Sequence, residues 1–322
     1  MKQFLSSSAA ALPALLFAAS LAAQGFPTKP IRLVATSTPG SPVDIYARAI
    51  SDHLAKSMGQ PVLVENRAGA GGTLAAAYVL GSEPDGHVVM VNTSAQVVAP
   101  FVYTGLAFDM LRDFAGIGPI AVLPNVLIVA PQRGWKSLQD LIAAARAKPG
   151  GYTYGTGGSG TGTHMNAERF RLRAGIAAVQ VPYKGSPEIL VEIVPGRIDW
   201  AFVPLSTVLG QVKEGRIQAL ALSAERRSAQ LPELPTLTEA GLNNADFPFW
   251  VGMFVSSKVP RTVVRRLYDD TLKAMKDPEV RDRLIKLGAE IVLMTPEEFD
   301  AYVKSQAEVA AVIVKAANIK AN

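Results

Sequence analysis

Two loops rich in glycine and hydroxyl side chains are the segments of this chain best suited to bind an anion. The first, residues 36–44, follows the apolar run 31–35, and the second, residues 155–164, follows residues 152–154. Each loop leads into a helical pattern, so its free backbone N–H groups and the positive end of the helix dipole point at one place. Two such half-sites could close on one ligand from opposite sides.

Catalytic interpretations of these residues lack their partner groups. Gly155 to Gly160 match the G-x-G-x-x-G spelling of a dinucleotide site. Such a site needs an acidic residue at the end of the next strand, whereas that strand, expected at 178–181, is followed by Pro182. A nucleophile elbow would need glycine where Thr161 stands. The three histidines lack zinc spacing and there is no cysteine. The sequence therefore predicts a protein that is not an enzyme and uses no metal or cofactor.

The charge balance argues against nucleic acid as a partner. The chain has 32 Lys and Arg against 27 Asp and Glu, which gives a net charge of +5. This excess is small and evenly spread, with no basic run longer than two residues, whereas a nucleic-acid-binding face is strongly basic. A mildly positive protein suits a small anionic ligand.

The first 23 residues have the pattern of an export signal. Lys2 gives a basic start, residues 9–19 are almost wholly apolar, and residues 20–23 are small. The apolar stretch is too short to span a bilayer, so we expect a signal peptide at residues 1–23, cleaved after Ala22 or Ala23. The alternative is a buried N-terminal helix. Export predicts a periplasmic protein of a Gram-negative bacterium.

Apolar runs alternate with helical patterns along the rest of the chain. Strands are expected at 31–35, 61–64, 87–91, 117–122, 126–130, 152–154, 178–181, 198–203, 219–223, 249–256 and 290–294. Helices are expected at 43–58, 73–81, 138–147, after residue 163, and at 187–194, 263–275, 280–286 and 296–317. This alternation predicts an α/β fold with open, mostly parallel sheets covered by helices on both faces. In such sheets, ligands bind beyond the carboxyl ends of the strands, where the glycine loops lie.

The length of the chain favours two domains. About 300 residues after the signal are too many for one ordinary core. We expect the chain to cross between domains near Leu123 and Ala245, so that residues 24–123 plus 246–322 form domain 1 and residues 124–245 form domain 2. Two crossings make a hinge, which allows the domains to close about a central cleft.

Seven segments occur in an order that is typical of one family. They are 26–32 (FPTKPIR), 39–44 (PGSPVD), 65–72 (ENRAGAGG), 84–86 (PDG), 154–164 (YGTGGSGTGTH), 181–185 (VPYKG) and 235–241 (PTLTEAG). With them, the chain resembles the Bug family, the periplasmic solute-binding receptors of tripartite tricarboxylate transporters. The resemblance covers essentially the whole mature chain. It implies two doubly wound α/β domains, like those of type II periplasmic binding proteins, with a ligand cleft between them.

The resemblance also implies a role. The protein would capture a small carboxylate, held largely by backbone amides and ordered water, and deliver it to the permease subunits of a membrane transporter. The alternative is a periplasmic sensor that signals to a two-component system without a transport role. By class, the protein is expected to be a monomer.

Carried over by position, the resemblance assigns ligand-binding roles to residues of both domains. They are Thr38, Gly40, Ser41, Asp44, Ala70, Thr93, Thr156, Gly157, Ser159, Thr161, Thr163, His164, Tyr183, Lys184, Gly185, Val203 and Pro204. Loop 40–44 would hold one carboxylate, with Asp44 orienting a water or capping loop amides. Loop 156–163 would hold the other end of the ligand, and residues 68–72 and 183–186 would line the cleft. For Asp44, Lys184 and His164, ordinary roles remain open: a helix-start acid, a solvated lysine, and a cap or packing residue. Ser159, Thr161 and Thr163 could likewise serve only as hydrogen-bonding residues within their loop.

Two positions depart from the family pattern. Ser41-Pro42 replaces a second glycine after the loop proline, and Val203-Pro204 replaces an Asp-Asn pair that often follows the equivalent of Phe202. An unmatched buried polar ligand group costs a few kcal/mol. The loss of two polar groups therefore favours an apolar ligand portion near Val203-Pro204, such as a ring or a longer alkyl chain.

Ligand preference tests this hypothesis. The purified mature protein is expected to bind adipate- or benzoate-like acids more tightly than malate, since malate would place polar groups against an apolar wall. Calorimetric titration with these acids measures the difference. A strong preference for malate would contradict the hypothesis.

Overall fold

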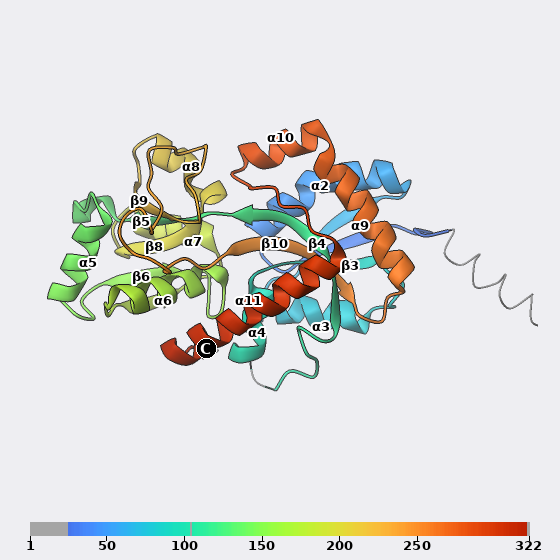
Figure 1. The fold of residues 1–322 in the computed structure, drawn as a ribbon, viewed down its shortest axis with the longest axis horizontal. Helices are drawn as coiled ribbons and strands as arrows, with labels where there is room; N and C mark the ends of the chain where they lie inside the picture. The colour runs from blue at the N-terminus through green and yellow to red at the C-terminus, as the bar shows by residue number, and fades with distance from the viewer. Residues whose placement is uncertain (1–24, 104, 321–322) are drawn as a thin grey trace, which may run out of the picture.

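The computed structural model describes residues 25–103 and 105–320, so the predicted signal peptide lies outside the described residues. Two five-stranded sheets lie one after the other along the longest axis of the molecule (Figure 1). Within the described residues, no helix combines the length and apolar content needed to cross a bilayer.

The first sheet has the order β2-β1-β3-β10-β4. Its strands are Val62–Asn66, Ile31–Ala35, Val88–Thr93, Phe249–Ser256 and Phe114–Leu123, in that order. β1 is parallel to β2 and to β3, while β10 is antiparallel to both of its neighbours, β3 and β4.

The second sheet repeats this arrangement with the order β7-β6-β8-β5-β9. Its strands are Val179–Pro182, Thr153–Thr156, Trp200–Pro204, Asn125–Val129 and Gln218–Ser223, in that order. β5 is antiparallel to its neighbours β8 and β9, and the other pairs are parallel. The predicted α/β fold with mostly parallel strands is confirmed, with one antiparallel strand in each sheet.

The chain passes between the sheets twice. β4 ends at Leu123 and β5 begins at Asn125, so the first crossing is the single residue Pro124, and the chain returns through residues 224–248. β4 and β5 form an almost continuous ribbon in Figure 1. Phe249, the first residue of β10, pairs with Leu123, the last residue of β4. The two connections therefore run side by side, which is the geometry of a two-strand hinge.

Helices cover both faces of each of the two sheets and pack against them to form the hydrophobic cores. These helices are α2 Pro42–Met58, α3 Thr73–Gly81, α4 Ala95–Val102, α5 Leu138–Ala147, α6 Gly162–Ala174, α7 Ser186–Ile193, α8 Leu205–Lys213, α9 Arg261–Lys276, α10 Pro278–Lys286 and α11 Pro296–Ala317. Short 3₁₀ turns, η1 Ala70–Gly72 and η2 Pro131–Arg133, lie in the loops. In the first sheet, α2, α9 and α10 cover one face and α3, α4 and α11 the other. In the second sheet, α7 and α8 lie opposite α5 and α6. Burial of each large apolar side chain contributes about 1.5–3 kcal/mol.

Local sequence explains where α2 and α6, the helices that follow the two glycine loops, begin. Pro42 occupies the first turn of α2, where its missing N–H costs nothing, and Ser41 is the N-cap residue. Thr161 is the N-cap of α6, and its hydroxyl accepts a hydrogen bond from the His164 amide. Both helices end at a glycine in the left-handed region, Gly59 and Gly175.

One expected element is wrong. Residues 290–294 were expected to form a strand, but only Glu290 makes an isolated bridge, to Val122. α4 and α8 were not expected, because α4 contains Pro100 and both follow a strand after at most one residue. The sequence pattern there runs from strand to helix without a turn signal.

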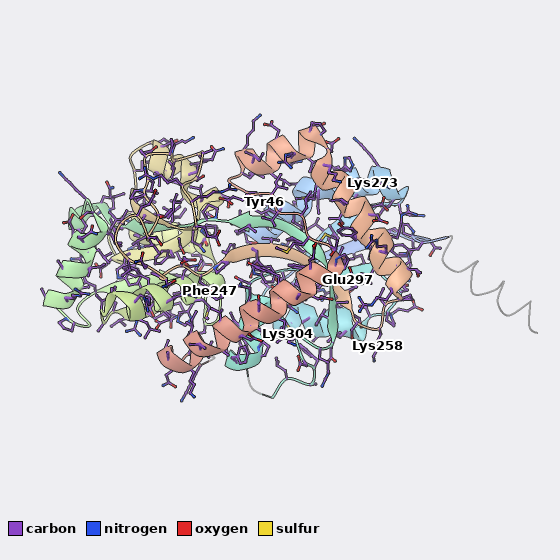
Figure 2. All side chains as sticks on the ribbon, viewed as in Figure 1. Tyr46, Phe247, Lys258, Lys273, Glu297 and Lys304 are labelled. Atoms are coloured by element: carbon purple, nitrogen blue, oxygen red, sulfur yellow. The ribbon has the colours of Figure 1, made fainter. Side chains whose placement is uncertain are left out.

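The amide of Asn166 on α6 joins the second sheet to the returning segment. Its Nδ2 donates to the Phe247 carbonyl at 2.8 Å, and its Oδ1 accepts from the Phe247 amide at 3.2 Å and from the Ser223 hydroxyl. Phe247 is labelled in Figure 2. Because Asn166 pairs with both backbone groups of Phe247, α6 is tied to the segment 224–248, which returns to the first sheet.

Candidate ligand cleft

A cavity of about 410 Å³ lies between the two walls formed by the strand-end loops. From the first sheet it is lined by Thr36, Ser37, Thr38, Ala68, Gly69, Ala70, Gly71, Gly72, Asn92, Thr93, Ala95 and Tyr103. From the second it is lined by Gly157, Gly158, Ser159, Thr161, Tyr183 and Lys184. A larger hollow, about 950 Å³, lies away from both loops, along α5 and β9. We place the candidate site in the smaller cavity because both polar loops meet there.

The first wall is neutral. The Thr36 hydroxyl donates to Asn92 Oδ1 and Asn92 Nδ2 donates to Gln96 Oε1, each at 2.9 Å, and all three residues are buried. Gly72 has φ +93°, and a Cβ there would lie 3.2 Å from Asn92 Oδ1. Glycine thus lets the backbone of residues 68–72 approach the cavity closely.

Asp44 holds the first loop and does not line the cavity. Its Oδ2 accepts from the Gly40 amide at 3.0 Å, and its Oδ1 accepts from Arg48 Nε at 2.9 Å. Of the two roles expected for Asp44, the structure shows the capping of a loop amide. Gly40 and Ser41 also lie outside the lining residues. The Ser41 hydroxyl is buried without a hydrogen-bond partner in the described part of the chain.

The second loop is held by its own side chains. The Gly157 amide donates to Thr163 Oγ1 at 2.9 Å, and the Gly160 amide donates to His164 Nδ1 at 3.1 Å. The Thr161 hydroxyl donates to the Gly158 carbonyl at 2.8 Å. Thr163 and His164 therefore shape the loop from behind the cavity, while Thr161 both shapes the loop and lines the cavity.

Gly158 and Ser159 carry hydrogen-bond donors that have no acceptor within the described residues. Ser159 is one of the residues that line the cavity, it is 8% exposed, and its Oγ is buried with no partner among the described residues. The backbone amides of Gly158 and Ser159 likewise donate to no acceptor in residues 25–103 and 105–320. They lie just before the N-terminus of α6, whose dipole favours an anion.

His164 is neutral in this setting. Burial lowers its pKa from 6.5 to about 4, nearby Glu168 opposes this shift, and Arg171 adds to it. Its Nδ1 must be unprotonated to accept from the Gly160 amide. The histidine thus acts as a cap of the loop, one of the ordinary roles left open by the sequence.

The segment after β7 supplies the far edge of the second wall. The Tyr183 amide donates to the Thr156 carbonyl at 2.8 Å, and the Lys184 amide donates to Glu188 Oε2 at 3.1 Å. Burial raises the pKa of the Tyr183 phenol. The Lys184 side chain is exposed and is the one charged group among the lining residues. Gly185 lies beside Thr38, outside the lining.

Three further predicted residues do not line the cavity. Thr156 is buried at the end of β6, where its hydroxyl accepts from Gln180 Nε2 at 2.9 Å. Val203 and Pro204 are buried in β8 and pair with Val126 and Asn125. The hypothesis that Val203-Pro204 faces an apolar ligand portion gains no support from this arrangement. Thr93 and Ala70 do line the cavity.

Sequence reasoning missed some lining residues. Thr36, Ser37 and Asn92 are polar residues at or just after strand ends, a signal that would have found them. Tyr103 carries no such signal, since it follows the apolar helix α4. Its hydroxyl donates to the Ser159 carbonyl at 3.2 Å, across the cavity from one wall to the other.

The lining residues indicate binding by neutral dipoles. They include no carboxylate and no imidazole, and Lys184 is the one charged residue among them. In the described ranges, no cluster of three His, Asp or Glu side chains is arranged to hold a metal ion.

Comparison with known proteins identifies the family. The model of the tripartite tricarboxylate transporter family receptor matches residues 46–319. The chain belongs to this family.

Solved structures agree with this assignment. Rpa4515 of R. palustris, solved with adipate, is 28% identical, with a TM-score of 0.86 over 91% of this chain and 99% of that one. MatC of Rhodopseudomonas palustris, solved with malate, is 27% identical, with a TM-score of 0.84 over 90% and 100%. The periplasmic binding protein BugD is 25% identical, with a TM-score of 0.84 over 92% and 100%. The resemblance to the Bug family and the fold of a periplasmic solute-binding protein are confirmed.

The lowered pKa of His164 predicts a pH-dependent stability. Because the folded-state pKa lies below 6.5, this contribution is complete above pH 6.5 and is lost as the pH falls toward 4, by about 3 kcal/mol. Urea unfolding from pH 7 to pH 4 measures the loss. His164→Asn keeps an acceptor for the Gly160 amide without titrating, so its free energy of unfolding should fall less. Equal slopes for both proteins would show that His164 does not contribute.

Proposed function

We propose that this receptor is exported by its signal peptide and captures a small carboxylate in the cleft. The observation that carries the proposal is the set of free donors at Ser159, which faces the first wall across the cavity. It would deliver the ligand to the permease subunits of a tripartite tricarboxylate-type transporter, acting by binding and release without catalysis.

The electrostatics of the cleft support an anionic ligand. A carboxylate accepts hydrogen bonds only, and bonds to a charged acceptor are about twice as strong as neutral ones. The free amides of Gly158 and Ser159 and the start of α6 supply donors and a favourable dipole. The acid at the end of the first loop, Asp44, forms an ion pair with Arg48, so its charge opposes an anion less.

The chain connections support closure as the capture step. In the proposal, residues 24–123 plus 246–322 and residues 124–245 move as two domains. Both connections between them lie side by side at β4 and β10, so rotation there would separate the walls and admit solute.

A thermal-shift screen of organic acids tests the proposal. A ligand at a hundredfold its Kd stabilises the folded protein by about 2.7 kcal/mol, which corresponds to several degrees in a protein of this size. We expect dicarboxylates or aromatic acids to raise the melting temperature of the mature protein, and the corresponding neutral amides to raise it less. A screen in which no acid shifts the melting temperature would contradict the proposal.

Ser159→Ala separates binding from folding. The Ser159 hydroxyl is buried with no protein partner in the described residues, so its removal breaks no hydrogen bond in the free protein and should not lower the free energy of unfolding. Loss of a hydrogen bond to a charged ligand costs about 1.5–3 kcal/mol, which predicts at least about tenfold weaker binding by calorimetry.

Thr163→Ala is the control for this substitution, because it also removes a hydroxyl from the second loop, but one that holds the loop and lies outside the cavity lining. Thr163 Oγ1 accepts from the Gly157 amide behind the loop, so its loss should lower stability by about 1 kcal/mol or more. If Ser159→Ala binds as tightly as wild type, the hydroxyl does not contact the ligand.

A further inference from the structure

Tyr103 occupies the gap between the two walls at the end of α4. It is the C-cap residue of this helix, and its ring packs on Gly71, where an added Cβ would lie 2.7 Å from the ring. Gly71 has φ +61°, so both its conformation and the ring beside it require glycine. The ring therefore rests on the first wall with no side chain between them.

The same residue reaches the second wall. Its hydroxyl donates to the Ser159 carbonyl at 3.2 Å. Its neighbour Val102 and also Val98 lie against Gly160, with 3.4 Å from each to an added Cβ. The end of α4 thus docks on the loop that carries the free donors, and burial raises the pKa of the Tyr103 phenol, which keeps the hydroxyl protonated as a donor.

Tyr103 differs in size from the other residues that line the first wall. All other lining residues of the first wall are Gly, Ala, Ser, Thr or Asn, and Tyr103 is its one large side chain. The walls also approach each other where Thr38 lies beside Gly185. A ligand between the walls is therefore bounded on the α4 side by the Tyr103 ring.

We propose that Tyr103 determines which carboxylates the cleft retains: its ring limits the length of the ligand, and its hydroxyl holds the walls together. This inference rests on the proposed function. The two roles belong to different atoms, so two substitutions separate them.

The length limit is tested with Tyr103→Ala and the linear dicarboxylates from succinate to suberate. Removal of the ring opens space at the end of the cavity, and each accommodated methylene is worth about tenfold or more in discrimination. We expect the ratio of Kd values, suberate over succinate, to fall by about tenfold or more relative to wild type. An unchanged ratio would overturn the length limit.

The hydroxyl is tested with Tyr103→Phe, which keeps the ring. The ratio of Kd values across the series should stay as in wild type, while release of the bound acid in stopped-flow measurements should be about three- to tenfold faster, as expected for the loss of one hydrogen bond. Unchanged release rates would overturn the role of the hydroxyl. Tyr152→Ala, a tyrosine outside the cavity lining that packs on Trp135, is the control for loss of a tyrosine elsewhere.

Failure of this inference differs from failure of the proposed function. If wild type binds no member of the series and no other acid of the thermal-shift screen, the proposed function fails. If wild type binds only acids outside the series, the length limit set by Tyr103 fails and the proposed function stands. If wild type binds and the variants keep both its length profile and its release rate, only the role of Tyr103 fails. Melting temperatures of the ligand-free variants show that they are folded.

Discussion

The pairing of Asn166 with the backbone of Phe247 is the interaction on which the position of the second wall depends. Asn166 is fully buried, and its amide also donates to the Gly162 carbonyl at the start of α6. Its loss would leave the Phe247 C=O without this partner, at about 1–3 kcal/mol for a buried group, and would leave the Phe247 N–H with its longer bond to the Ser223 hydroxyl, at 3.4 Å. Because α6 follows directly on the loop 157–161, this pairing relates the free donors at Ser159 to the segment about which the walls would rotate.

The polar side chains of the two loops have two different roles. The side chains of Asp44, Thr163 and His164 accept hydrogen bonds from backbone amides of their own loops. These bonds fix loops that glycine would otherwise leave flexible. The loops are therefore ordered by the protein's own hydrogen bonds, so that less of the binding free energy is lost to ordering them when a ligand binds. The hydroxyls of Ser41 and Ser159 differ, because both are buried with no partner in the described residues, and of the two only Ser159 lies among the cavity-lining residues.

The neutral character of the cleft suits reversible binding. A buried cation would carry a desolvation penalty in the empty cleft, whereas the Thr36–Asn92–Gln96 network and the loop amides carry no net charge. Dipoles fixed by the fold can stabilise an anion with little reorganisation. Lys184 stays exposed at the rim, where water screens its charge and weakens its attraction to an anion. Such a site can bind a carboxylate and still release it.

The sequence by itself determined the α/β class, the two glycine loops and the family, because strand–helix alternation and the order of short motifs are properties of the chain in one dimension. It did not distinguish residues that hold a loop from residues that line the cavity. Gly40, Asp44, Thr163 and His164 belong to the first kind, and the distinction depends on which way each side chain points. Only the tertiary structure brought Tyr103 to Ser159, since they lie 56 residues apart, one at the end of α4 and one in the loop before α6, and meet because α4 packs against the second loop.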